Sequence, residues 1–162
     1  MAHKESVQEN ALKAFLHGSP FFWTVSSSVG YACRNKKEDV LLVQFFLNRI
    51  FAAAQAAFDE DPYVDDPVFP KQLVPDGDFG GKTWGAIKWF QKRSKYCVVD
   101  GMVSAANGTR LLTPKQGMWY TIYMLNGFYR EGFPDKFQGI RCDKELPVLL
   151  LSHLSGPLPE LV

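Results

Sequence analysis

The sequence predicts a mostly α-helical fold. Apolar residues recur every three or four positions in several separate stretches, which is the spacing of one face of an α-helix. The clearest stretches lie at 39–57 and 82–95. Hydrophobic residues make up 46% of the 162-residue chain, which is enough for one sizeable core. We therefore expect a single domain over residues 1–162, with these two helices at its centre.

The N-terminal part is expected to contain a short helix and an extended segment. Ser6 and Glu9 have the spacing of a capping box, which predicts a helix over 6–17. Residues 20–25 are rich in aromatic and β-branched side chains and predict an extended conformation. Asp39 is expected to cap the first main helix, because carboxylates accept hydrogen bonds from the free N–H groups of a helix start.

A proline-rich and acidic stretch separates the two main helices. Five carboxylates lie within residues 59–66, and prolines stand at 62, 67 and 70. Proline has no backbone N–H and disrupts a helix, so 58–75 is expected to be an acidic loop insertion. It lacks the ligand alternation and central glycine of an EF-hand, which favours a solvated loop over a metal site. It is also a candidate docking surface for a basic protein partner.

Three further helices are expected toward the C-terminus, at 104–111, 115–130 and 146–154. The segment 115–130 is apolar around most of its circumference, which is typical of a helix that is buried or forms an interface. We expect 113–162 to be a helical C-terminal extension that packs on the rest of the chain. The apolar helix within it, 117–129, is a second candidate surface for a protein partner.

Two Asp-Gly pairs, at Asp76 and Asp100, mark tight turns, because Asp bonds its own backbone and Gly supplies the positive φ. Gln44 and Gln91 occupy equivalent places in the two main helices. A buried amide must find hydrogen-bond partners. Each glutamine is therefore expected to bridge its helix to the opposite turn, with a ligand contact as the less favoured alternative.

These features resemble the repeat of the three-helix peptidoglycan-binding domain family. That repeat combines a V-x-x-[VL]-Q-x-x-L helix, a D-G-x-F-G-x-x-T-x-x-A-[IV]-x-x-F-Q helix and a D-G entry to a short third helix. The resemblance covers 28–112 and implies a three-helix core. The matching residues are Val40, Val43, Gln44, Leu47, Asp76, Gly77, Phe79, Gly80, Thr83, Ala86, Ile87, Phe90, Gln91, Asp100 and Gly101. We expect the buried core to hold Val40, Val43, Leu47, Phe79, Ala86, Ile87 and Phe90.

The resemblance implies non-catalytic binding of peptidoglycan in a groove between the first two main helices. Trp84 is preferred over Trp89 as a sugar-stacking ring, because residues 84 and 88 share a helix face. Similar modules accompany phage lysis enzymes and contractile secretion machinery. The alternative is a protein-interaction component that reuses the fold. The expected ligand-binding residues are Gln44, Asp76, Phe79, Trp84, Lys88 and Gln91.

Other function classes are disfavoured by composition and motifs. The formal net charge of +1 provides no general attraction to nucleic acid. His3, His17 and His153 lack the spacing of a zinc hydrolase, and no carboxylate pair is marked for glycoside hydrolysis. We therefore expect no catalytic residue, metal ligand or cofactor, and an enzyme is the least favoured hypothesis.

The N-terminal sequence MAHKESVQENALKAF is too polar for a signal peptide, and no apolar run reaches the length of a membrane span. The protein is expected to be cytoplasmic as synthesised. If it binds peptidoglycan, its site of action is the periplasm or cell wall, reached by non-classical delivery. The widely spaced Cys33, Cys97 and Cys142 are expected to be free thiols.

Overall fold

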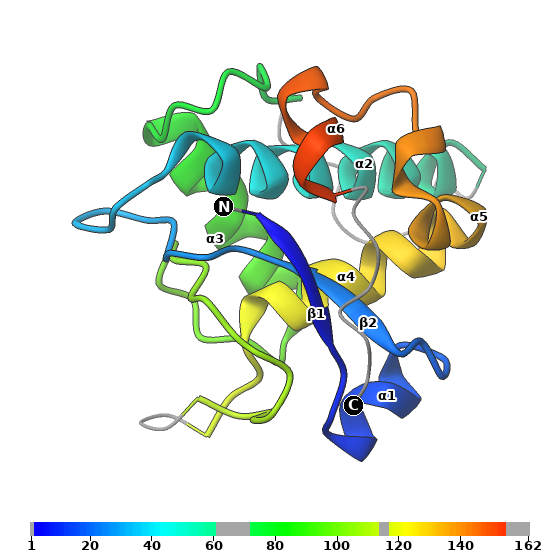
Figure 1. The fold of residues 1–162 in the computed structure, drawn as a ribbon. Helices are drawn as coiled ribbons and strands as arrows, with labels where there is room; N and C mark the ends of the chain where they lie inside the picture. Colours follow the sequence, from blue (N-terminus) through cyan, green and yellow to red (C-terminus); the bar gives the residue numbers. More distant parts are fainter. Residues whose placement is uncertain (1, 61–71, 114–116, 155–162) are drawn as a thin grey trace.

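The computed structural model describes residues 2–60, 72–113 and 117–154. The described chain is mostly helical, as predicted (Figure 1). Its two short strands form an antiparallel sheet in which His3 pairs with Thr24 and Ser6 pairs with Phe21. The elements in chain order are β1 (His3–Ser6), α1 (Asn10–Phe15), β2 (Phe21–Thr24), α2 (Lys37–Glu60), α3 (Gly81–Ser94), α4 (Thr121–Gly132), α5 (Pro134–Gln138), the 3-10 helix η1 (Ile140–Cys142) and α6 (Val148–Leu154).

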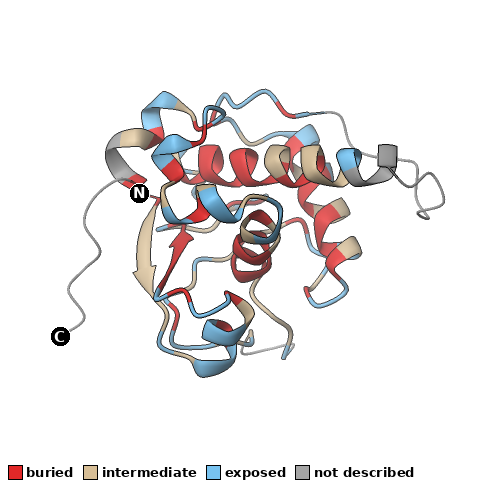
Figure 2. Ribbon diagram, turned by 90° about the vertical axis from the view of Figure 1, so that its right-hand side faces the viewer, coloured by how far each residue is buried: buried red, intermediate tan, exposed pale blue. Residues whose placement is uncertain are grey.

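The core is built around α2 and α4. Figure 2 shows long buried stretches on both helices. α2 packs against α3, α4 and α6, which explains why its residues 39–47 are buried on every side. The rings of Phe45 and Phe46 lie 5.4 Å and 5.3 Å from that of Tyr129 on α4. Aromatic pairs at this separation add to the stabilisation from burial alone.

Most of the predicted core is buried. Phe79 is the exception, since it is only half-buried and packs at the edge of the core. The predicted positions that are fully enclosed are Val40, Val43, Leu47, Ala86, Ile87 and Phe90.

The predicted N-terminal helix is wrong in its first half. Ser6 belongs to β1, and Glu9 caps a shorter α1 by accepting a hydrogen bond from the Leu12 N–H at 2.8 Å. Asp39 does not cap α2 but lies inside it. Its buried carboxylate accepts hydrogen bonds from the backbone N–H groups of Ser26 and Ser27 at 3.1 Å and 3.0 Å, which ties α2 to the end of β2.

Three further boundaries are corrected. The predicted helix at 104–111 is absent, and that segment has no regular structure between the isolated bridges at Val103 and Leu112. The helix expected at 115–130 begins only at Thr121, and the C-terminal helix begins at Val148. Of the predicted loop 58–75, residues 58–60 continue α2, whereas 61–71 lie outside the described residues.

Candidate functional site

The first Asp-Gly turn is held by Gln44 of α2. The Gln44 Nε2 donates to the Asp76 carboxylate at 3.1 Å, to the Asp78 carbonyl at 3.2 Å and to the Thr83 hydroxyl at 3.2 Å. Its Oε1 accepts from the Gly77 N–H at 3.0 Å. One buried amide thus joins α2, the turn and the first turn of α3.

The second turn repeats this arrangement one helix later. The Gln91 Nε2 of α3 donates to Asp100 at 2.9 Å, to the Met102 carbonyl at 3.0 Å and to the Thr121 hydroxyl at 3.0 Å. Its Oε1 accepts from the Asp100 and Gly101 N–H groups at 3.0 Å and 2.8 Å. The helix that receives this second turn is α4, and not the predicted helix at 104–111.

Both glutamines therefore have structural roles. Gln44 and Gln91 are each 1% exposed, and the Nε2 donors of both are engaged within the protein. The expectation that they also contact a ligand stays a prediction, and the structure does not favour it, because the Nε2 donors are already used within the protein. The bridging role, which the sequence favoured, is confirmed.

The two turns also share a requirement for glycine. Gly77 and Gly101 have φ values of +77° and +73°, in the left-handed region that side chains disfavour. A Cβ at Gly77 would meet Lys37, and one at Gly101 would meet the indole of Trp84. Lys37 and Trp84 precede Gln44 and Gln91 by the same number of residues. One side of the Trp84 indole therefore packs against the second turn, and the side chain as a whole is half-buried.

An aromatic group lies on the surface beside these turns. The Tyr31 ring is 5.2 Å from that of Phe79 and 5.5 Å from that of Trp84, and the Lys88 Nζ lies 4.3 Å from the Trp84 centroid. Tyr31 is 61% exposed, whereas the other three side chains are half-buried. We call these four residues the Tyr31 patch. It contains three of the predicted site residues.

The loop that carries Tyr31 is closed by its own hydrogen bonds. The Gly30 N–H donates to Asn35 Oδ1 at 2.9 Å, and Asn35 Nδ2 donates back to the Gly30 carbonyl at 2.8 Å. Val29 forms a bridge with Val103, next to the second Asp-Gly turn. The patch is therefore assembled from this hydrogen-bonded loop, from Phe79 just before α3 and from two residues of α3.

A hollow of about 340 Å³ adjoins the Tyr31 patch at the start of α3. Phe79 belongs to both, so an extended ligand can contact the two together. Hydrogen bonds from the Asp78 N–H and, to a smaller extent, from the Gln44 amide hold the pKa of Asp76 below its usual range. This carboxylate is therefore ionised at neutral pH. The lining residues are Gln44, Leu73, Val74, Asp76, Asp78, Phe79, Gly80, Gly81, Lys82 and Thr83.

Trp89 belongs to a different surface. Its ring packs edge-on against Phe51 at 5.1 Å, and the Arg93 guanidinium lies 5.5 Å from it. Trp89 and Arg93 border a mainly apolar hollow of about 350 Å³ between α2, α3 and α4, whose wall also includes Phe128. The two tryptophans of α3 therefore cannot serve one continuous sugar platform.

Two surfaces were predicted as candidates for a protein partner, and the structure describes only one of them in full. Most of the helix expected at 117–129 is buried within α4, which packs against α2 and β2, so it is not a free interface. The acidic stretch of the predicted loop lies largely outside the described residues. The exposed aromatic Tyr31 was missed from the sequence, although it lies within the range 28–112 that the resemblance covers.

The described residues contain no cluster of three or more His, Cys, Asp or Glu side chains that could hold a metal ion. Within the same part of the chain, no helix has the length and apolar character needed to cross a membrane. Comparison of the chain with protein-family models, curated proteins and solved structures finds no match. Function must therefore be argued from the site itself.

Proposed function

We propose that this chain is a non-catalytic peptidoglycan-binding protein and that the Tyr31 patch is its glycan platform. The observation that carries the proposal is the exposed Tyr31 ring, which contacts Phe79 and Trp84 directly beside the hollow at the start of α3. The motif resemblance supports the same function from the sequence side. Tyr31 itself is not part of the motif, whereas Phe79 belongs to both the motif and the patch.

The chemistry of the patch suits a sugar polymer. Sugar rings present C–H faces that stack on aromatic side chains, while their hydroxyl and amide groups need polar partners. Tyr31 and Trp84 offer ring faces, and Asp78 and Lys82 in the neighbouring hollow offer charged hydrogen-bonding groups. Lys88 adds a positive charge that suits the carboxylates of the peptide stems.

Tyr31 combines an exposed ring with fixed aromatic neighbours. Its side chain is 61% exposed, so most of the ring is open to a ligand. Its contacts with Phe79 and Trp84 hold the ring in place before any ligand arrives. A pre-organised ring loses little side-chain entropy on binding.

Sedimentation with purified sacculi tests this proposal. Tyr31→Ala is expected to weaken binding about tenfold, equivalent to about 1.4 kcal/mol, because stacking on the exposed ring is lost. Tyr96→Ala is the matched control, since Tyr96 is also 61% exposed but has no part in the patch. Equal binding by both variants would refute the role of the patch.

The second candidate is a protein-interaction component, and the apolar hollow at Trp89 and Phe128 favours it. The same sedimentation assay separates the two functions. If the wild-type protein does not sediment with sacculi, peptidoglycan binding is contradicted. The protein-interaction component then becomes the favoured hypothesis.

A further inference from the structure

A separate hollow lies on another part of the molecule, between β1 and the segment 105–110. It measures about 560 Å³. We propose that it binds a small ligand that carries a free carboxylate group and is about the size of a dipeptide. This inference does not rest on peptidoglycan binding at the Tyr31 patch, because no residue is shared between the two sites. The lining residues used below are His3, Glu5, Asn107, Thr109, Arg110 and Tyr120.

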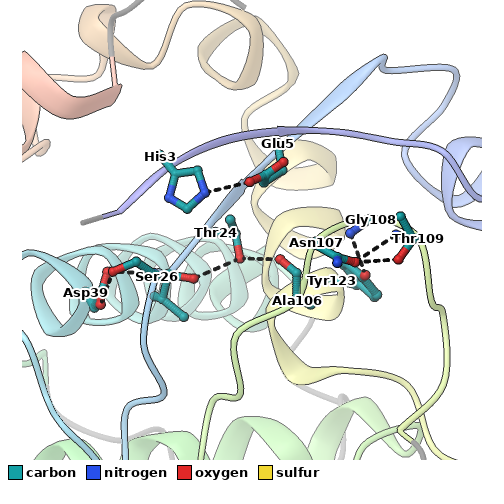
Figure 3. A network of polar contacts seen from close by, with 11 residues as sticks. His3, Glu5, Thr24, Ser26, Asp39, Ala106, Asn107, Gly108, Thr109 and Tyr123 are labelled. Atoms are coloured by element: carbon teal, nitrogen blue, oxygen red, sulfur yellow. Dashed lines mark hydrogen bonds and ion pairs between the residues drawn. The ribbon is translucent and has the colours of Figure 1, made fainter. Parts of the chain in front are cut away.

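The wall formed by residues 107–110 is built around a buried tyrosine. The Tyr123 hydroxyl accepts a hydrogen bond from the Gly108 N–H at 3.0 Å (Figure 3). It donates to the Arg110 carbonyl at 2.9 Å. Burial raises the pKa of Tyr123 to about 12, so the hydroxyl keeps its proton and this donor role at neutral pH. The backbone that presents Arg110 is thus fixed from within the core.

Glycine and asparagine complete that wall. Gly108 has a φ of +82°, and a Cβ there would collide with the Ser6 carbonyl of β1. Asn107 Oδ1 accepts from the Thr109 N–H at 3.2 Å and from its hydroxyl at 2.6 Å, as Figure 3 shows. The loop therefore passes close to β1 in one defined conformation, and its shape does not depend on a ligand.

The hollow offers donors that are open to a ligand, since Arg110 and Asn107 are exposed and Tyr120 is half-buried. Among the described residues, the Arg110 guanidinium makes no ion pair or hydrogen bond, and the hydroxyl of Tyr120 makes no hydrogen bond. The Asn107 Nδ2 likewise donates to no group in the described chain. A guanidinium with neutral donors beside it matches a carboxylate, which accepts several hydrogen bonds at once.

The acidic residue of the hollow is Glu5, which would repel a carboxylate. Its Oε1 lies 2.8 Å from the Nε2 of His3, so this negative charge is directed toward the imidazole (Figure 3). Among the described lining residues, Arg110 is the only arginine or lysine. The arrangement makes two opposite predictions: loss of the Arg110 charge should weaken binding, and loss of the Glu5 charge should strengthen it.

Chemical-shift titration of the full chain with alanyl-alanine tests the proposal. We expect shifts at the backbone N–H groups of 105–110 and of β1, with an affinity in the millimolar range. The carboxamide of the same dipeptide should bind at least about tenfold more weakly, because it carries no charge for Arg110. Using the L,L and D,D forms separates a protein C-terminus from a bacterial wall peptide as the source of the carboxylate.

Three variants complete the experiment. Arg110→Gln should weaken binding about tenfold and Glu5→Gln should strengthen it, whereas Arg141→Gln should change nothing, because Arg141 is exposed on η1 outside the hollow. The proposal is overturned if neither dipeptide shifts these signals, if the carboxamide binds as well as the acid, or if Arg110→Gln leaves the affinity unchanged. Spectra of each variant without ligand establish that it folds.

Discussion

At the scale of single residues, two buried glutamines hold the centre of the chain together. Each uses one amide to join a helix, an Asp-Gly turn and the start of the next helix. A neutral amide is suited to this role, because it donates and accepts at the same time without the desolvation cost of a charge. The hydroxyls of Thr83 and Thr121 complete the two sets.

Removal of one of these amides should be costly. Gln91→Ala leaves the N–H groups of Asp100 and Gly101 without their acceptor, so we expect a loss of about 2–4 kcal/mol in the free energy of unfolding. Urea denaturation measures it, with the exposed Gln138→Ala on α5 as the control, expected within about 0.5 kcal/mol of wild type. Similar midpoints for the two variants would contradict the anchoring role.

The candidate site could be predicted from the sequence only in part. The spacing of Gln44, Gln91 and the Asp-Gly pairs indicated the two turns, because each relation is local and repeated. Tyr31 carried no such signal. Its importance comes from contact with Phe79 and Trp84, which lie some fifty residues away in the chain, and the sequence does not show which distant side chains meet.

At the scale of elements, periodicity located the two main helices to within a few residues. α2 and α3 follow from their apolar spacing and from the glycines before α3. The helix at 104–111 was predicted wrongly, because the left-handed Gly108 and the Val29–Val103 bridge hold that segment open. Ser6 was assigned to a cap because its pairing with Phe21 is a tertiary contact that local patterns do not contain.

Glycine substitutions test the elements directly. Gly101→Ala should strongly destabilise the protein, because a left-handed φ of +73° is combined with a collision against Trp84. Gly85→Ala should instead stabilise it by about 0.5–1 kcal/mol, since Gly85 is exposed within α3 and a Cβ there meets nothing. Thermal unfolding of both variants measures these effects. If the unfolding temperatures of the two variants shifted in the same direction, this account of the second turn would be wrong.

At the scale of the whole molecule, the segments that flank the motif complete its core. Asn126 of α4 donates to the Trp23 carbonyl and accepts from the Trp23 N–H, both at 2.7 Å, which fastens α4 to β2. Near the C-terminus, buried Asp143 accepts from Arg49 of α2 at 3.0 Å and from the Tyr129 hydroxyl at 2.8 Å. These long-range pairs explain why the apolar α4 is buried and not an interface.

The central claim, that the Tyr31 patch binds peptidoglycan, is tested most directly by the indole N–H signals of the four tryptophans. On addition of soluble peptidoglycan fragments, the signal of Trp84 should shift, because its ring belongs to the patch. Trp23 is buried with its indole N–H donating to the Phe137 carbonyl, and Trp89 faces another hollow, so both should stay unchanged. An unmoved Trp84 signal at saturating fragment, or a shift confined to Trp89, would contradict the claim.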